Sequence, residues 1–294
     1  MPELPDVEVF KRYVDATSLH KRIEDVDTGD ARLLEDTSGS ALSRVLKGSE
    51  LLSTRRHGKY LFVSHRSADG SQGRSDSADD AEGHLLLHFG MTGFVNYYKE
   101  SGSAAGTGST SGNEAESGKG RQSSHEQLIL HFDNGYCLAY DNQRLLGQID
   151  LVTDVDEFIA TENLGPDAYS IPEEEFRDAL TGRGSVKSRF MNQSIIAGIG
   201  NVYSDEICFQ AGIDPRRRLS DLSDDDRHDL YQAMHRVLDV VVSNDADPGK
   251  LPDSYLTPRR EDGAACPRCS TGSQKSGSSK SGSPQSDSRN SGSV

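Results

Sequence analysis

The chain has 294 residues, 33% of them hydrophobic, and a formal net charge of −15 from 32 Lys and Arg against 47 Asp and Glu. This length predicts about two domains, and no apolar run approaches the ~20 residues of a membrane span. The first residues lack the basic and apolar regions of a signal peptide, and the four cysteines do not suggest a disulfide framework. We therefore expect a cytoplasmic protein with no membrane partner.

The first 150 residues read mainly as β-structure after an opening helix over residues 6–16. The turn Asp133-Asn134-Gly135 predicts a β-hairpin that leads into residues 136–140. Short apolar runs predict strands at residues 61–63, 84–89 and 128–132. Two stretches within this region, residues 64–83 and 99–125, contain no large aliphatic residue. Because they cannot offset the entropy of ordering, we expect them to be mobile insertions.

The pattern becomes helical after residue 166. Residues 223–226 (SDDD) resemble a capping box, and apolar residues at helical spacing follow it. Two further helices are expected around the turn at residues 197–200 (AGIG), one ending near Ile195 and one beginning at Asn201. Backbone N–H groups at that second helix start can bind a phosphate. An ordinary helix–helix turn is the alternative.

The opening residues 1–8 (MPELPDVE) carry a group with distinctive chemistry. Removal of Met1 would leave Pro2 with a secondary amine, and an α-amino pKa near ~8 gives an appreciable neutral fraction at neutral pH. Such an amine can form an iminium with a sugar carbonyl carbon, and the neighbouring Glu3 can move protons. The alternative is structural: Pro5 occupies the first turn of a helix whose N-terminus favours acidic residues.

This opening resembles the formamidopyrimidine-DNA glycosylase and endonuclease VIII family of base excision repair enzymes, in which a Pro-Glu-Leu-Pro-Glu-Val-Glu-like stretch is the hallmark. Asp6 in place of Glu is a conservative departure. The resemblance covers most of residues 1–218 outside the two insertions. It continues through residues 55–61 (RRHGKYL), 88–93 (HFGMTG), 187–193 (KSRFMNQ), 198–206 (GIGNVYSDE) and 211–213 (AGI).

The resemblance implies an α+β fold in three parts. Residues 1–150 would form a β-rich, sandwich-like catalytic domain, and residues 151–250 a helix-two-turn-helix DNA-binding domain. Residues 251–294 would form a degenerate zinc-finger remnant with a Ser- and Gly-rich tail. The implied activity is that of a bifunctional DNA glycosylase and AP lyase, acting as a monomer on damaged double-stranded DNA and associated with the nucleoid.

The same resemblance assigns catalytic roles. Pro2 attacks the anomeric carbon of the damaged nucleotide, expels the oxidised base through an iminium intermediate, and elimination then nicks the strand. Glu3 assists the chemistry at the sugar. Lys59 reaches the phosphate of the lesion and donates a proton during strand cleavage. Without the family, Lys59 would be interpreted as a solvated lysine at the end of a strand.

Three further residues are expected at the lesion. Met91 acts by resemblance as an apolar wedge that fills the gap left by a flipped nucleotide; a core methionine is the alternative. Residues 141–147 (DNQRLLG) stand where related enzymes carry Asp-x-Arg-Arg-Phe-Gly, with one extra residue and no Phe. Arg144 is therefore the candidate contact to the orphaned base, with Leu145 or Leu146 replacing the aromatic wedge, or else a surface arginine. His125 matches a DNA-contacting histidine; a solvated loop histidine is the alternative.

Phosphate contacts are expected from the helical region. By resemblance Lys187 and Asn201 contact the DNA backbone, and Arg183, four residues before Lys187, can join them. Glu206 matches its motif well and is interpreted as a structural helix acid rather than a catalytic one.

Cys266 and Cys269 are the candidate metal ligands. Related bacterial enzymes end in a finger with two cysteine pairs, and a closed structural zinc site needs four ligands. No second pair follows Cys269, so we expect an incomplete site without zinc and a reaction that requires no cofactor. The arginine that the finger normally supplies has no counterpart in the sequence. Base removal and first-step cleavage are therefore expected to survive better than complete β,δ-elimination.

The charge of −15 opposes DNA binding unless the charges are unevenly distributed. Basic residues fall in or beside the motifs, including Arg55, Arg56 and residues 216–218 (RRR), whereas acidic residues concentrate in the insertions and on helix faces. An acidic surface also suits a salty cytoplasm, which leads to the hypothesis of a halophilic source. Activity and solubility that fall monotonically with added KCl would contradict it.

Two alternatives to this assignment of function remain open. One is an endonuclease VIII-like preference for oxidised pyrimidines. The other is a non-catalytic protein that binds damaged DNA and has lost turnover together with its finger.

Overall fold

The computed structural model describes residues 1–67, 83–100 and 123–272. Most of residues 64–83 and 99–125, the expected mobile insertions, therefore lies outside the described residues. At their edges the expected boundaries were wrong, because residues 64–67, 83 and 99 belong to strands. Backbone pairing explains this: Ser64 and His65 continue the ladder opposite Ser53 and Leu51, and a ladder does not require apolar side chains.

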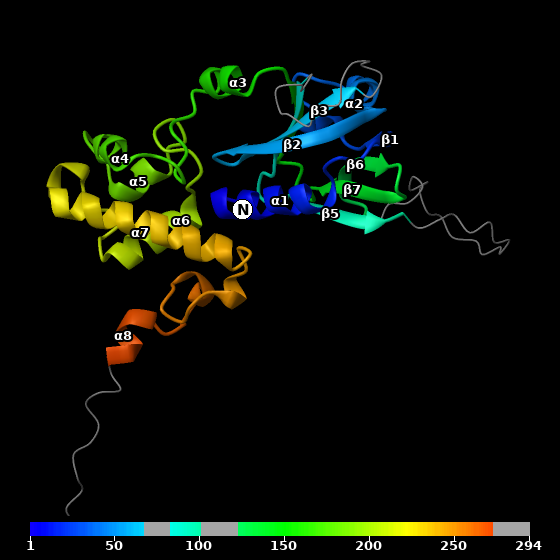
Figure 1. The fold of residues 1–294 in the computed structure, drawn as a ribbon. Helices are drawn as coiled ribbons and strands as arrows, with labels where there is room; N and C mark the ends of the chain where they lie inside the picture. Colours follow the sequence, from blue (N-terminus) through cyan, green and yellow to red (C-terminus); the bar gives the residue numbers. More distant parts are fainter. Residues whose placement is uncertain (68–82, 101–122, 273–294) are drawn as a thin grey trace, which may run out of the picture.

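The strand-rich half is a two-layer sandwich of four-stranded antiparallel sheets (Figure 1). One sheet has the order β2-β3-β4-β8 and the other β1-β6-β7-β5. The strands are β1 (Ile23–Thr28), β2 (Ser49–His57), β3 (Tyr60–Ser67), β4 (Gly83–His88), β5 (Phe94–Lys99), β6 (Glu126–Phe132), β7 (Tyr136–Asp141) and β8 (Gln148–Val152). The predicted hairpin at residues 133–135 joins β6 to β7, with Gly135 at φ 76°.

The core of this half follows from the alternation of side chains along the strands. Leu61, Val63, Leu85 and Leu87 of one sheet belong to the same buried cluster as Leu128, Leu130 and Leu138 of the other. Two helices cover the edges: α1 (Leu4–Thr17), which lies along β2, and α2 (Gly39–Leu46), which lies along β1.

The helical half contains α3 (Val155–Thr161), α4 (Glu173–Ala179), α5 (Val186–Phe190), α6 (Asn201–Ala211), α7 (Asp224–Ser243) and α8 (Pro267–Gly272). The capping box at the start of α7 is confirmed: Ser223 accepts from the Asp226 N–H, and the Asp226 side chain accepts from Ser223. The long apolar stripe of α7 packs against α6 and forms the centre of this half's core.

The helix expected to end near Ile195 ends at Phe190 instead. The reason is tertiary. The chain after Phe190 turns to pair with the segment that follows the sandwich: Gly165 N–H donates to Gln193 O (2.9 Å) and Ala197 N–H to Pro166 O (2.9 Å). These backbone bonds replace the intrahelical ones that a longer α5 would have made.

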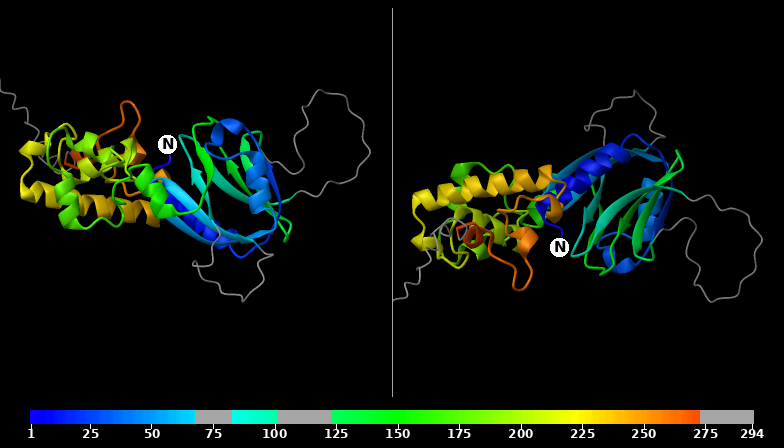
Figure 2. Two further views of the ribbon diagram at one scale, coloured as in Figure 1. Left: turned by 90° about the horizontal axis from the view of Figure 1, so that it is seen from above. Right: turned by 90° about the horizontal axis from the view of Figure 1, so that it is seen from below.

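The two halves meet at the β2–β3 turn. The Arg56 guanidinium makes two bonds to the Asp167 carboxylate (2.5 and 2.9 Å) and a third to Glu8 (2.9 Å), with its side chain 6% exposed. Gly58 N–H also donates to Asp167 (2.6 Å). Figure 2 shows the amino terminus lying between the halves. Within the described part of the chain, no helix has the length and apolar character needed to cross a bilayer.

Candidate active site

Glu3 is a buried acid in the region where the two halves meet, here called the junction. It is 1% exposed although it carries a carboxylate. The carboxylate accepts hydrogen bonds from three backbone N–H groups at the start of α6: Gly200 (2.7 Å), Val202 (2.8 Å) and Tyr203 (3.2 Å). Charge-assisted bonds and the positive end of the helix dipole stabilise a buried anion. Glu3 therefore connects the first helix to the helix-two-turn-helix region.

This arrangement differs from the expected phosphate site at residues 198–201. Three of the N–H groups at the start of α6 already donate to Glu3, so they are not free for a phosphate. Nothing in the sequence indicated this, because the acid that accepts from these three groups comes from the other end of the chain. Asn201 itself is exposed at the first helical position and remains accessible.

The Lys59 side chain also lies at Gly200, at the start of α6. A Cβ placed on Gly200 would be 2.6 Å from the Glu3 carboxyl carbon and 2.9 Å from Lys59 Nζ, so both side chains meet over this glycine. Lys59 is 9% exposed. Burial lowers the pKa of its ammonium below the ordinary value, and the Glu3 charge opposes part of that effect. Lys59 thus has a more readily released proton than a surface lysine.

Burial shifts the pKa of two other side chains in this region. Burial, with a contribution from the Lys59 charge, lowers the pKa of His88 to about 4, so this histidine is neutral at physiological pH. Burial also raises the pKa of Asp6 to about 6, although the Glu3 N–H donates to its Oδ2 (2.8 Å). Asp6 and Glu3 cap α1 reciprocally, and Pro5 lies in its first turn, so the structural interpretation of the opening also applies.

Glycines allow the close approach of the two halves. Gly198 has φ 111°, and a Cβ there would lie 2.5 Å from Leu4 Cδ1. Gly58 has φ 55°, and its Cβ would lie 3.0 Å from that of Ala197. Leu4 N–H donates to Gly198 O (3.0 Å), which aligns the start of α1 with the turn before α6. Pro2, half-buried beside Glu3, is thereby held at the junction.

The expected lesion contacts lie on loops of the sandwich. Met91 is 39% exposed in the turn between β4 and β5. Arg144 is exposed, and its N–H donates to Thr92 Oγ1 (3.2 Å), so its loop adjoins that turn. His125 is half-buried, and its carbonyl accepts from Asn142 N–H (2.9 Å). Met91, Arg144 and His125 therefore belong to one rim, here called the loop rim.

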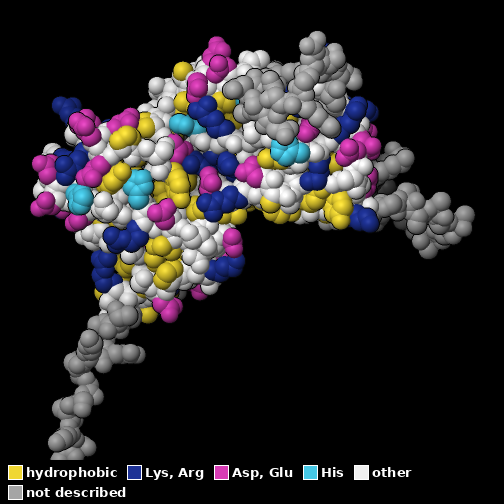
Figure 3. All heavy atoms as spheres, viewed as in Figure 1, with side chains coloured by type: hydrophobic (Ala, Val, Ile, Leu, Met, Phe, Trp, Pro, Cys, Tyr) yellow, Lys and Arg dark blue, Asp and Glu magenta, His cyan; other side chains and the backbone are white. Residues whose placement is uncertain are grey.

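The residues of the helical half that are expected to contact phosphates differ in their surroundings. Lys187 is paired with Asp205 (2.6 Å). Arg183 is exposed and lines a cavity of about 410 Å³ together with Arg218 and the backbone around Gly184. Figure 3 shows Lys and Arg side chains gathered on one face where the two halves meet.

Some basic residues that the sequence suggested for DNA binding form ion pairs with carboxylates instead. Arg55 pairs with Asp156, and Arg56 is buried against Asp167. Arg56 therefore joins the two halves instead of facing a phosphate. Sequence reasoning could not detect this, because Arg56 and Asp167 are 111 residues apart.

Arg260 was missed by the sequence analysis. Its guanidinium donates to Val202 O (3.3 Å) and pairs with Asp205 (2.9 Å) at the first turn of α6. It therefore adds a cation next to Asn201. The sequence around it gave no signal beyond the pair Arg259-Arg260. Glu206, as expected, is structural: it is fully buried and accepts from the N–H (2.7 Å) and hydroxyl (2.7 Å) of Thr257.

The C-terminal segment does not supply a zinc finger. Cys266 and Cys269 are both exposed, and the two remaining cysteines, Cys137 and Cys208, are buried in other elements. Two thiols do not complete a tetrahedral structural site, so the residues present do not fit the zinc of related fingers. The described end of the segment instead forms α8, whose Arg268 lies over the Phe209 ring (4.5 Å).

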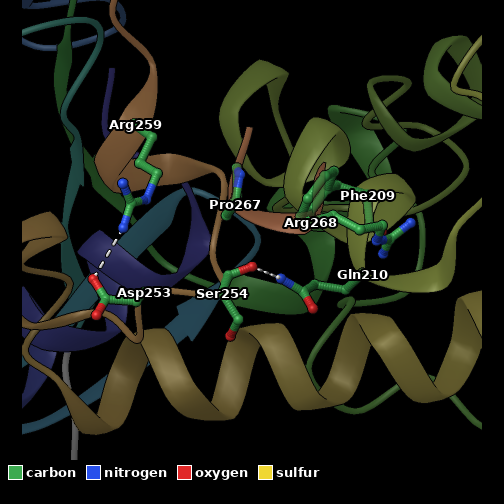
Figure 4. A pocket seen from close by; sticks show the side chains of 7 residues that line it. All are labelled: Phe209, Gln210, Asp253, Ser254, Arg259, Pro267 and Arg268. Atoms are coloured by element: carbon green, nitrogen blue, oxygen red, sulfur yellow. Dashed lines mark hydrogen bonds and ion pairs between the residues drawn. The ribbon is translucent and has the colours of Figure 1, made fainter. Parts of the chain in front are cut away.

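A cavity of about 550 Å³ lies where α8 meets the end of α6 (Figure 4). Gln210 donates to Ser254 O (3.2 Å) and Arg259 pairs with Asp253 (3.1 Å) in its wall. Because the 11 residues of α6 span about 16 Å, this cavity is at the opposite end of the helix from Glu3. It is therefore separate from the candidate active site.

Fold and site together define an α+β protein in two halves, with its amino terminus, a buried acid and a buried lysine held where a sandwich meets a helix-two-turn-helix. Residues 1–149 match the formamidopyrimidine-DNA glycosylase N-terminal domain, and residues 164–251 match the formamidopyrimidine-DNA glycosylase H2TH domain. The chain belongs to the formamidopyrimidine-DNA glycosylase family, and it is a DNA glycosylase of base excision repair. The expected α+β fold is likewise confirmed.

Individual relatives agree with this assignment. The chain is 30% identical to formamidopyrimidine-DNA glycosylase of Solibacter usitatus, over 82% of this chain and 77% of that protein. It is 30% identical to the Gluconobacter oxydans enzyme of the same name, over 92% and 91%. A solved structure of Lactococcus lactis Fpg in complex with DNA containing N7-benzyl-Fapy-dG has a TM-score of 0.67 at 22% identity, covering 82% of this chain and 79% of the other.

Proposed function

We propose that the chain is a bifunctional DNA glycosylase and AP lyase that acts on damaged double-stranded DNA through the amine of Pro2. The observation that carries the proposal is the convergence of Glu3 and Lys59 over Gly200, with Pro2 next to Glu3 in the chain. Residues 1–150 would supply the chemistry and residues 151–250 the grip on DNA, so the protein would act at the nucleoid.

The proposed reaction begins after removal of Met1, which frees the Pro2 nitrogen. Its lone pair attacks C1′ of the damaged nucleotide, and the glycosidic bond breaks with its electron pair leaving on the base, which takes up a proton. Opening of the sugar ring, with proton transfer assisted by Glu3, gives the iminium. Loss of a C2′ proton then expels the 3′ phosphate, and water releases the enzyme from the sugar.

Lys59 suits the role of proton donor during strand cleavage. Its pKa is lowered by burial, which brings the ammonium closer to the range in which proton transfer is efficient. The remaining positive charge also attracts the phosphate of the lesion. A solvated lysine would offer neither property to the same degree.

The remaining site residues would position the DNA. We propose that Met91 fills the space of the flipped nucleotide and that Arg144 contacts the orphaned base, with His125 beside them. The exposure of Met91 and Arg144 on the loop rim supports this. In the helical half, phosphate contacts are proposed for Lys187, Asn201, Arg183 and the newly recognised Arg260.

Formamidopyrimidine-type oxidised purines are the proposed substrate class. The support is the name shared by the relatives and by the matching domains. Because the C-terminal segment has one cysteine pair, we expect base removal and the first elimination to exceed the second elimination. Arg260 at the start of α6 is the candidate replacement for a finger arginine.

Borohydride trapping tests the proposal. The processed protein should form a covalent complex with a duplex that contains an abasic site, and Pro2→Gly should abolish or strongly reduce it. Intact mass would first establish whether Met1 is removed. A processed protein that binds the duplex but forms no trapped complex would overturn the enzyme and favour a non-catalytic DNA-damage binding protein.

A panel of duplexes tests the substrate class separately. Excision of formamidopyrimidine lesions should be faster than excision of oxidised pyrimidines, with the opposing base varied for each lesion. A faster rate on oxidised pyrimidines would replace the proposed preference with an endonuclease VIII-like one.

A further inference from the structure

A cluster of ligand-type side chains lies on the sandwich, outside the candidate active site. Cys137 on β7 is the register partner of His131 on β6, and Glu100 directly follows β5. Cys137 packs with Tyr98 and Ile129 in a small buried cluster that is separate from the core between the sheets. The three side chains therefore gather on the outer face of the β5-β7-β6 sheet.

The two separations from His131 Nδ1 match those between metal ligands. His131 Nδ1 is 3.3 Å from Cys137 Sγ and 3.3 Å from Glu100 Oε1, and the three ligand atoms lie within 4.8 Å of one another. In a tetrahedral zinc site, bond lengths of ~2.3 Å to sulfur and ~2.0–2.1 Å to nitrogen and oxygen place neighbouring ligand atoms about 3.3–3.6 Å apart. The side chains are thus positioned around a point that a zinc ion can occupy.

The second ring nitrogen of His131 supports this geometry. His131 Nε2 lies 3.3 Å from Asp27 Oδ2 on β1. Nδ1 likewise faces the Glu100 carboxylate, so each ring nitrogen has a carboxylate beside it. A metal ion bound at Nδ1 would leave the Nε2 proton to donate to Asp27. Metal-binding histidines are oriented in the same way, with the other ring nitrogen donating to a carboxylate.

The local charge also favours a cation. Glu100, Glu126 and Asp27 bring negative charge to the surroundings of the Cys137 thiol. The carboxylates that disfavour a bare thiolate attract a divalent ion, and a bound metal ion removes the thiol proton.

We propose that Glu100, His131 and Cys137 form a zinc-binding site, with Asp27 orienting the histidine and water as the fourth ligand. The site joins the end of β5 to the β6–β7 hairpin, and it is independent of the glycosylase chemistry. It is also distinct from the exposed pair Cys266 and Cys269, which lies in the C-terminal segment.

Cobalt(II) is the probe for this site, because thiolate ligation gives a charge-transfer band in the near ultraviolet. The reduced full-length protein would carry Cys266→Ser and Cys269→Ser, so that the exposed pair cannot contribute. One equivalent of cobalt should bind with this band, and added zinc should displace it. Adding Cys137→Ala should remove the band. Cys208→Ala, which changes the other buried thiol, should leave it intact.

Two further variants keep the test decisive if Cys137→Ala does not fold. His131→Gln and Glu100→Gln change half-buried ligands, and circular dichroism would verify their fold. Both should weaken cobalt binding at least tenfold, and Asp27→Asn should weaken it less. Absence of the band in the Cys266→Ser, Cys269→Ser protein, or its persistence in folded His131→Gln, would overturn the proposal and leave a hydrogen-bonded cluster only.

Discussion

The junction between the halves and the loop rim of the sandwich are built in opposite ways. At the junction, Glu3 is 1% and Lys59 9% exposed, and the Glu3 carboxylate is held by three backbone N–H groups. On the rim, Met91 is 39% exposed, and Leu146, in the same loop as Arg144, is 52% exposed. Packing and hydrogen bonds hold the junction in one arrangement, whereas the Met91 and Arg144 side chains of the rim are exposed. The proposed chemistry therefore lies on the rigid part of the molecule, and the proposed lesion contacts lie on exposed loops.

The contrast predicts where substitutions are costly. A change at the junction leaves buried polar groups without partners or forces backbone apart, and each is a recognised cause of large destabilisation. A change on the rim meets water instead. The junction should therefore respond in both stability and activity, and the rim in activity alone.

Glu3→Gln should have the largest effect. Loss of the charge removes the proposed proton transfer, so base excision should fall about 100-fold or more, and three N–H groups at α6 lose their anionic acceptor. Single-turnover excision and urea unfolding measure the two effects. Glu206→Gln is the matched control, since Glu206 is equally buried on α6 and bonded to Thr257. It should lower stability with excision retained in the folded protein; equal losses of excision in both variants would contradict a role for Glu3 in the chemistry.

Arg56→Met should be the most destabilising of the charge changes. It leaves Asp167 buried without its guanidinium partner, which should lower the free energy of unfolding by about 3–5 kcal/mol. The neighbouring Arg55→Met breaks an exposed pair with Asp156 and should cost less than about 1 kcal/mol. Denaturant unfolding of both variants measures the difference. Similar losses would show that the Arg56 pair does not hold the halves together.

Gly198→Ala tests the close approach of Leu4. The new methyl group would lie 2.5 Å from Leu4 Cδ1 at a φ of 111°, so it adds a steric cost to backbone strain. Gly135→Ala, at φ 76° with no neighbour within 4 Å, should cost about 1 kcal/mol from strain alone. We expect Gly198→Ala to exceed it by about 1–3 kcal/mol. Thermal and urea unfolding measure both losses of stability. An equal loss in Gly198→Ala and Gly135→Ala would argue against tight packing of Leu4 on Gly198.

Asp6→Asn should change how stability depends on pH. Burial raises the pKa of Asp6 from 3.8 to about 6, so between these values the folded protein binds a proton that the unfolded chain has lost. The contribution of Asp6 to stability is therefore full below pH 3.8 and is lost as the pH rises through about 6. The melting temperature of the wild type relative to Asp6→Asn should fall across this window. A constant difference would mean that the carboxyl titrates normally.

Met91→Ala should have the smallest effect on stability, within about 0.5 kcal/mol, because the side chain is on the surface. Excision should nevertheless slow, since the proposed wedge at Met91 would be lost. The loss should be greater for a well-paired lesion than for a mispaired one, because a mispaired base costs less to unstack. Excision rates on the two duplexes provide the comparison, and an equal loss on both would count against a wedge.

Local signals were sufficient where a few consecutive residues carry the cause. The capping box of α7 was predicted because Ser223 and Asp226 satisfy one another within one turn, and the β6–β7 hairpin because Gly135 permits a positive φ. The end of α5 at Phe190 could not be predicted this way. It depends on backbone bonds to residues 165–168, which approach only when the sandwich and the helices are both folded.

The sequence alone determined the α+β class, the family and the residues that carry the proposed chemistry, because these depend on local periodicity and on motifs read in order along the chain. The tertiary structure alone decided which partners those residues have. Glu3 accepts a hydrogen bond from Gly200, which is 197 residues away. Arg56 forms an ion pair with Asp167, and Arg260 lies beside Val202. Such contacts arise from the packing of two separate cores against one another, and no local pattern encodes the relative position of two cores.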